Sequence, residues 1–234
     1  MQNREVATLA LGKMLKMDHL ANGTARNVEL NGKKEKGYIS EDLRSQHKAD
    51  GATIEFGDRH RGGLFDVSRK DPKMADKAMF DYMIGNTDRR SGNMMIKDHA
   101  DGKQEMLGFD HGLTFGNDNQ SLREHSFYGF NSNGAQGMIK SAGKQKEFTK
   151  GFVNALADVV KGANSSDGGS FAELNEFIED HIGGKEAESF RSRFADVVEG
   201  VLGNNEKHIG QVLNSVETRK TNERHEKIRK KIKL

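Results

Sequence analysis

The sequence predicts an α+β protein that is mainly helical and contains a small amount of antiparallel sheet. Two stretches, 25–40 and 94–109, have the pattern of β-hairpins because short apolar segments flank a polar turn. Apolar residues recur at helical spacing in three other stretches, 4–17, 72–84 and 145–202. Helices are therefore expected to form most of the protein, with both hairpins in its N-terminal half.

The N-terminal quarter predicts one helix followed by one hairpin. The helix covers 4–17, behind Asn3 as its expected cap. The hairpin has strands at 25–30 and 36–40 on either side of Asn31-Gly32, and its Lys/Glu-rich tip is polar. These elements form a unit that the next, polar stretch separates from the rest of the chain.

The middle of the chain predicts a loop and then a helix that ends beside a turn. Residues 41–71 are polar and rich in glycine, which is typical of a linker or loop. Pro72 suits the start of a helix, where its missing N–H costs nothing, and the apolar spacing continues to Ile84. Gly85-Asn86 then predicts the turn that leads the chain out of this helix.

The C-terminal half predicts a long loop followed by amphipathic helices. Residues 117–143 have little periodicity and contain aromatic residues separated by Gly and Asn, which favours a mobile loop facing a substrate. Helical periodicity returns at 145–161, 170–182 and 184–202, and a fourth helix is expected to begin at Asn205 and to run into a basic tail.

Composition excludes several classes of protein. The chain has 234 residues and no Cys, which excludes disulfides and cysteine nucleophiles, and none of its apolar runs approaches the roughly 20 residues of a membrane span. We therefore expect a soluble protein of the cytoplasmic type.

Residues 219–234 carry eight Lys/Arg and two Glu, whereas the whole chain has a net charge of only +2. This tail is either a solvated helix end or a contact for nucleic acid or an anionic membrane.

The chemistry of the chain is concentrated in one loop and the hairpin after it. Asp88 and Asn93 have the Asp-x-x-x-x-Asn spacing of a phosphotransfer loop, in which the Asp accepts a hydroxyl proton and the Asn holds a metal ion. Asp110 follows the 94–109 hairpin and is expected to lie beside Asn93 as a second oxygen ligand, the type that Mg²⁺ prefers. The alternative is an ordinary polar turn, since Asp, Asn and Gly are common turn residues.

Two motifs in this order resemble the superfamily of the phosphatidylinositol 3- and 4-kinases, which includes bacterial members and the actin-fragmin type of protein kinase. They are Asn86-Thr-Asp-Arg-Arg-Ser-Gly-Asn93 and Asp110-His-Gly-Leu113, and Arg4-Glu-Val-Ala resembles the start of the family's regulatory helix. The resemblance covers 4–116 and implies a protein-kinase-like fold. Its domains would be a truncated small lobe of regulatory helix and hairpin at 1–48, a mainly helical large lobe at 49–218, and a basic tail at 219–234.

The resemblance also implies roles for individual residues. Asp88 would be the catalytic Asp, and Asn93 and Asp110 would hold Mg²⁺ against the phosphates of ATP. Arg90 stands where the family has His, so it cannot act as a base, although its guanidinium is suited to steadying phosphate charge. Residues implied to line the nucleotide site are Met95 and Phe109 under the adenine, and Ile39 and Ser40 at the end of the strand leading into the hinge.

The sequence given contains neither the Gly-rich phosphate loop nor the Lys-bearing strand of such kinases, so Glu5 has no expected partner. We therefore expect a fragment, a protein whose small lobe another segment or chain completes, or a degenerate kinase. Two functions stay open: an ATP- and Mg²⁺-dependent phosphotransferase that acts on a protein rather than a lipid, and a catalytically inactive pseudokinase that serves as a binding or assembly module.

Overall fold

The computed structural model describes residues 2–20, 23–30, 33–40, 42, 44, 52–59, 67, 70–86, 88–89, 91–116, 146–162, 170–212, 214–216 and 218, with only the backbone at 23–30 and 33–40. In chain order the elements are α1 (Gln2–Met14), β1 (Gly23–Leu30), β2 (Lys33–Ser40), β3 (Thr53–Phe56), α4 (Met74–Met83), η2 (Ser91–Asn93), β4 (Met94–Asp98), β5 (Gln104–Gly108), α5 (Lys150–Val160), α6 (Phe171–His181), α7 (Gly184–Val198) and η4 (Glu199–Gly203). The predominance of helix, with two small antiparallel sheets, agrees with the predicted α+β class.

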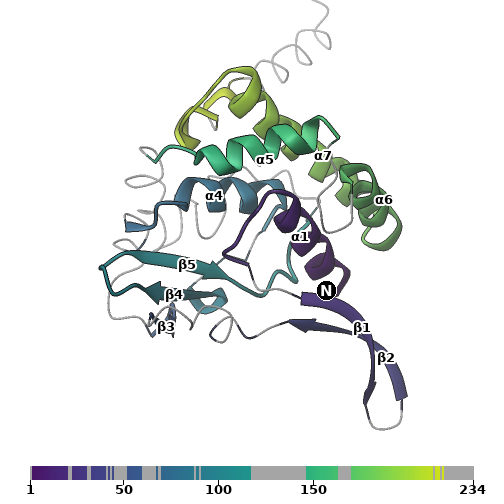
Figure 1. Cartoon of the computed structure of the whole chain (residues 1–234). Helices are drawn as coiled ribbons and strands as arrows, with labels where there is room; N and C mark the ends of the chain where they lie inside the picture. Colours follow the sequence, from purple (N-terminus) through teal and green to yellow (C-terminus); the bar gives the residue numbers. More distant parts are fainter. Residues whose placement is uncertain are drawn as a thin grey trace, which may run out of the picture.

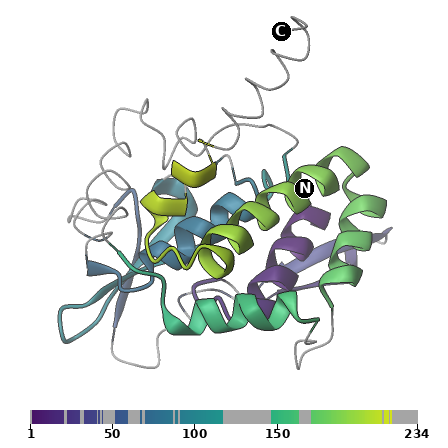
Figure 2. The ribbon, with the colours of Figure 1, turned by 90° about the horizontal axis from the view of Figure 1, so that it is seen from above.

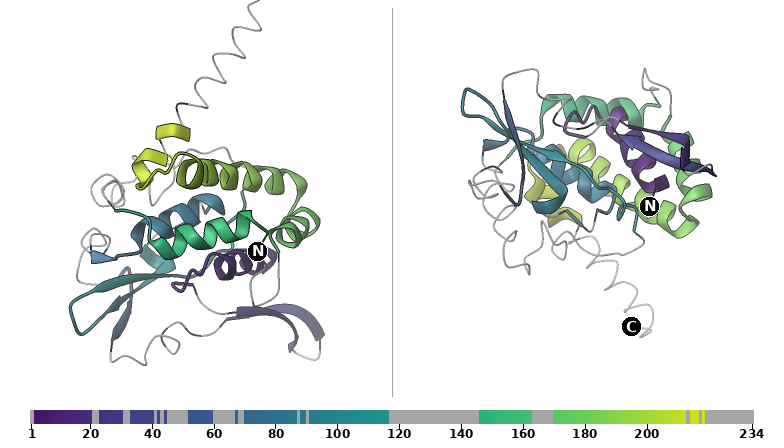
Figure 3. Two further views of the ribbon diagram at one scale, coloured as in Figure 1. Left: turned by 45° about the horizontal axis from the view of Figure 1, so that its top comes forward. Right: turned by 90° about the horizontal axis from the view of Figure 1, so that it is seen from below.

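The first predicted hairpin is confirmed as the two-stranded sheet β1–β2. Its register places Leu30 opposite Lys33, which leaves Asn31 and Gly32 as the two-residue connection, and β2 begins three residues earlier than expected. The hairpin projects from the body of the protein beside α1 (Figure 1). It lies away from the second sheet in both views of Figure 3.

The second predicted hairpin is confirmed as β4–β5, with Met94 opposite Gly108 and a turn at Gly102, whose φ of 81° suits a glycine. The prediction that 41–71 is only linker and loop was wrong, because β3 lies within it and pairs with β4, Phe56 opposite Met95. Ile54 and Phe56 do alternate with polar residues, but four residues are too short for that pattern to stand out. Hydrogen bonding to β4, which is distant in the sequence, stabilises this strand.

The three predicted C-terminal helices are confirmed as α5, α6 and α7, which pack around α4 and α1 (Figure 2). α5 begins later than expected because Thr149 caps it, its side chain accepting a hydrogen bond from the amide of Phe152. The expected fourth helix is helical at 209–212, 214–216 and 218. The aromatic loop at 117–143 and the tail at 219–234 lie outside the described residues. No helix in the described part is long and apolar enough to cross a membrane.

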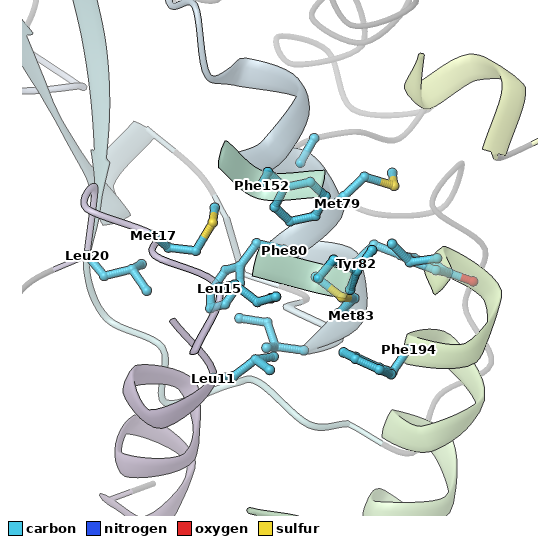
Figure 4. Close-up of a cluster of buried hydrophobic side chains, with 14 of the residues drawn as sticks. Leu11, Leu15, Met17, Leu20, Met79, Phe80, Tyr82, Met83, Phe152 and Phe194 are labelled. Atoms are coloured by element: carbon cyan, nitrogen blue, oxygen red, sulfur yellow. The ribbon is translucent and has the colours of Figure 1, made fainter. Parts of the chain in front are cut away.

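The N-terminal helix is anchored in the main hydrophobic core. Asn3 is not its cap, because α1 already begins at Gln2 and the side-chain amide of Asn3 donates to the carbonyl of His181, 3.1 Å away. Leu11 and Leu15 are fully buried in a core that also contains residues of α4, α5, α6 and α7. Figure 4 shows these two side chains facing Phe80, with Phe152 and Phe194 nearby. α1 and α4 are thus fixed against each other, whereas the predicted boundary near residue 48 stays a prediction.

Candidate active site

The candidate catalytic loop begins where α4 ends. Gly85 has a φ of 57° and turns the chain, and the amide of Asn86 then donates to the carbonyl of Asp81 at 2.9 Å. The Asn86 side chain holds both sides of the turn: its nitrogen donates to the Asp81 carboxylate at 2.9 Å and its oxygen accepts from the amide of Asp88 at 3.1 Å. The last turn of α4 and the start of the loop therefore form one hydrogen-bonded unit.

Asp88 and Asn93 contact each other directly. The side-chain nitrogen of Asn93 donates to a carboxylate oxygen of Asp88 at 2.8 Å and to the Asp88 carbonyl at 2.9 Å. Asn93 is buried at the end of η2, and Asp88 is only partly buried. The five-residue spacing thus forms a closed loop with the two side chains adjacent. Arg90 lies outside the described residues, and its role stays a prediction.

The β4–β5 hairpin brings Asp110 to the same end of the sheet as Asn93. The amide of Phe109 donates to the carbonyl of Asn93 at 3.2 Å, and Asp110 is the next residue. The backbone of Asp110 is left-handed, with a φ of 54°, and its exposed carboxylate makes no hydrogen bond or ion pair with the described residues. One side chain with an amide oxygen and one carboxylate fit Mg²⁺, which usually takes only one or two ligands from the protein and the rest from phosphate and water.

Arg89 links the parts of this site through buried hydrogen bonds. Its guanidinium forms a bidentate pair with the Asp81 carboxylate at 2.9 and 3.1 Å, and it donates to the carbonyls of Asn93 at 2.7 Å and Phe109 at 3.1 Å. Nη2, one of the two nitrogens that bond Asp81, also lies 2.8 Å from Nε2 of His111. We missed this role in the sequence, where Arg89 appeared only as a spacer of the motif. The available clue was Asp81, an acidic residue among the apolar positions of a helix.

The expectation that Glu5 has no partner was wrong, because Glu5 contacts His111. One carboxylate oxygen accepts from the His111 amide, and the other lies 3.4 Å from Nδ1 of the same residue. α1 makes two further contacts with the 110–116 segment. Arg4 donates to the carbonyl of Thr114, and the hydroxyls of Thr8 and Thr114 are 3.1 Å apart. Glu5 faces His111 because the common core holds α1 beside the 110–116 segment.

Burial lowers the pKa of His111, the nearby Glu5 opposes this change, and the charge of Arg89 adds to it. A neutral imidazole satisfies both neighbours if Nδ1 carries the proton and faces Glu5 while Nε2 accepts from Arg89. A continuous series of polar contacts then links Glu5 of α1 to Asp81 of α4 through His111 and Arg89. This tautomer follows from the hydrogen bonds of the two neighbours.

The model for the phosphatidylinositol 3- and 4-kinase family matches residues 72–166. Over this stretch the chain is similar to those kinases. The matched stretch contains α4, the Asp88 loop, the β4–β5 hairpin and Asp110, which are the elements that build the site described above. The predicted superfamily is thereby confirmed.

Two solved structures of the Golgi casein kinase, one with Mn/ADP bound, align with 93% of this chain at 12% identity, with TM-scores of 0.49 and 0.47. The chain spans 62% and 61% of their lengths. No curated protein is significantly similar to the chain in sequence.

The two residues implied to lie under the adenine, Met95 and Phe109, meet on one face of the three-stranded sheet. Met95 and Leu107 are buried there in a small cluster, separate from the main core, with Ile54, Phe56 and Phe109 packed against it. The rings of Phe56 and Phe109 meet edge to face with centroids 6.0 Å apart. Ile39 and Ser40 end β2, in the other sheet, and only their backbone is described. Contact of a nucleotide with Ile39, Ser40, Met95 and Phe109 stays a prediction.

His19 is a buried histidine beside Arg89. It borders a cavity of about 20 Å³, which has room for one water molecule. His19 is 6% exposed, its Nδ1 has no hydrogen-bond partner in the described part, and its ring meets Phe80 edge to face. Lys77 and Arg89 also line this cavity. Burial lowers the pKa of His19 well below its usual value, and the charges of Lys77 and Arg89 lower it further.

Folding stability is expected to fall in acid because His19 is held neutral. Below the ordinary histidine pKa of about 6.5 the unfolded chain binds a proton that folded His19 does not, so stability falls as the pH decreases from there. His19→Gln should reduce this slope between pH 6.5 and 5 by up to about 1.4 kcal/mol per pH unit. Urea unfolding at several pH values measures it. His181→Gln, at an exposed position, is the control, and equal slopes in the two variants would contradict the prediction.

Proposed function

We propose that the chain is an ATP- and Mg²⁺-dependent phosphotransferase built as the large lobe of a protein-kinase-like fold with a reduced small lobe. The observation that carries this proposal is the direct hydrogen bond from Asn93 to the Asp88 carboxylate, with the exposed Asp110 at the same end of the hairpin. In this proposal Asp88 is the base, and Asn93 and Asp110 are the metal ligands.

Each of these residues has a separate task in the proposed reaction. Bound Mg²⁺ would neutralise charge on the ATP phosphates. Asn93 directs its side-chain nitrogen to Asp88 and so keeps its oxygen for the cation, while Asp110 supplies a negative charge. The substrate hydroxyl oxygen bonds to the γ-phosphorus as the bond to the bridging oxygen of ADP breaks. The hydroxyl proton passes to the Asp88 carboxylate, which Asn93 holds in place.

We favour a protein hydroxyl over a lipid as the acceptor. Among the described residues the large apolar side chains that are exposed are Leu113 and Val160, which belong to different elements and form no patch suited to a membrane. Contact of the tail at 219–234 with nucleic acid or an anionic membrane, and a cytoplasmic location, stay predictions.

The alternative function is that of an inactive pseudokinase used as a binding or assembly module. It is favoured by the β1–β2 sheet, to which no third strand is added within the described part of the chain. The described elements therefore supply one side of a nucleotide site. For catalysis, another segment or a partner chain would have to supply the side of the site that binds the nucleotide phosphates.

The deciding experiment measures ATP hydrolysis and phosphate transfer by the purified chain, with Mg²⁺ and with EDTA. Asp88→Asn should lower turnover by about 10²- to 10⁴-fold, the usual contribution of a positioned base. Asp110→Asn should raise the Mg²⁺ concentration needed for half-maximal activity. Asp180→Asn, at an exposed position on α6, is the control.

The possible outcomes separate the two functions. Activity that requires Mg²⁺ and both carboxylates supports the phosphotransferase. Nucleotide binding that requires Asp110, without turnover, supports the pseudokinase. Turnover that is unchanged in both variants would sink the phosphotransferase proposal, because it would come from a contaminant or another site.

A further inference from the structure

We propose that Arg193 of α7 is a positioning residue that fixes the distance between the two parts of the candidate site. This inference rests on the proposed function. One part is the loop that carries Asp88, which begins at the end of α4. The other is the segment from Asp110 to Gly116. Arg193 lies outside both sequence motifs and is buried at 7% exposure.

The Arg193 guanidinium bridges these two parts of the chain. Its Nε donates to the carbonyl of Met83, the last residue of α4, at 3.1 Å. One terminal nitrogen donates to the carbonyl of Gly116 at 3.3 Å. Beside this bridge the amide of Phe115 donates to the carbonyl of Ile84. The end of α4 and the end of the Asp110 segment are therefore side by side, with Arg193 bonded to both.

The surroundings of the guanidinium suit a buried cation. The end of α4 presents carbonyl groups that lack a helical partner and carry the negative end of the helix dipole, which stabilises a cation there. Gly85 lies against the guanidinium, and a Cβ added to it would be 2.6 Å from a terminal nitrogen. The planar fork of arginine can donate in two directions at once, which the single ammonium group of lysine does poorly.

The position of this bridge explains how it would act on the chemistry. Asp88 lies three residues after Gly85, and the turn between them is held by Asn86. On the other side, Phe115 is fully buried against Phe190 of α7, with ring centroids 5.3 Å apart. Loss of the bridge would free both parts to move relative to each other. A displacement of about 1 Å in a reacting group costs on the order of 100-fold in rate.

The test compares Arg193→Ala and Arg193→Lys with Arg191→Ala, an exposed position on the same helix that pairs with Glu179. The quantity measured is kcat for ATP turnover per ATP-binding site, with the sites counted by nucleotide titration, so that loss of folded protein does not count. We expect Arg193→Ala to lower kcat by about 100-fold with little change in KM for ATP. We expect Arg193→Lys to have a kcat between those of Arg193→Ala and the wild type. Added guanidinium ion should raise kcat in Arg193→Ala but not in Asp88→Asn.

A readout without activity keeps this inference separate from the proposed function. Hydrogen exchange of the Phe115 amide, which bonds to Ile84, should be faster in Arg193→Ala than in Arg191→Ala, and guanidinium should slow it again. If the wild type shows no turnover, the proposed function fails, and exchange alone supports or overturns the bridge. Equal exchange and equal kcat per site in the two alanine variants would overturn it.

Discussion

Replacement of Arg89 by methionine is expected to lower the free energy of unfolding by about 3–5 kcal/mol, the range for removing one partner of a buried ion pair. Arg89 and Asp81 are each about 5% exposed, and without the guanidinium the Asp81 carboxylate would keep a buried charge without its main partner. The carbonyls of Asn93 and Phe109 would also lose a donor. Urea unfolding monitored by circular dichroism measures the change.

The control for this experiment is Arg191→Met, because Arg191 forms an exposed ion pair with Glu179 and should cost less than about 1 kcal/mol. The double variant Arg89→Met, Asp81→Leu should recover part of the loss, since a pair of apolar side chains leaves no buried charge. A loss in Arg89→Met no larger than in Arg191→Met would contradict the central role of Arg89.

Replacement of Gly85 by alanine is expected to cost about 2–5 kcal/mol, from two separate causes. The φ of 57° places Gly85 in a region that costs other residues roughly 1–2 kcal/mol. The new methyl group would also meet the Arg193 guanidinium at 2.6 Å, and overpacking of this kind costs about 1–3 kcal/mol. Thermal and urea unfolding together give the size of the effect.

The two causes can be separated by a second background. In Arg193→Ala the steric part should disappear, so Gly85→Ala should cost only the backbone part there. Gly184→Ala is the matched control, because a Cβ at that position in the first turn of α7 meets nothing within 4 Å. It should be neutral or slightly stabilising. An equal cost of Gly85→Ala in both backgrounds would show that Arg193 is not the obstacle.

Sequence patterns were sufficient wherever structure depends on neighbouring residues. A polar turn between two short apolar segments predicted β4–β5, and helical periodicity located α5, α6 and α7, because turn geometry and amphipathic faces are local properties. The hairpin in turn explains why Asn93 and Asp110, which are seventeen residues apart, could be expected at one end of a sheet. Their roles in catalysis stay a prediction.

Long-range contacts are what the sequence could not reveal. β3 depends on β4, almost forty residues later, and Glu5 meets His111 at a separation of 106 residues. Arg89 was overlooked because its four partners come from three stretches of the chain, none of which marks it as more than a motif spacer. Such contacts are decided by how helices pack in three dimensions, which a single sequence does not encode in any local pattern.

The burial of α1 in the common core limits how a regulatory helix could work in this protein. Leu11 of α1 and Leu15, which directly follows the helix, are 0% and 1% exposed, and exposing a leucine costs about 1.5–3 kcal/mol. An outward swing of α1 that exposed both would therefore cost roughly 3–6 kcal/mol and leave the displaced state at about 1% or less of the molecules. An effector that stabilised such a state would need a comparable difference in affinity between the two states. Small sliding of α1 along α4, which keeps both leucines buried, is the cheaper motion.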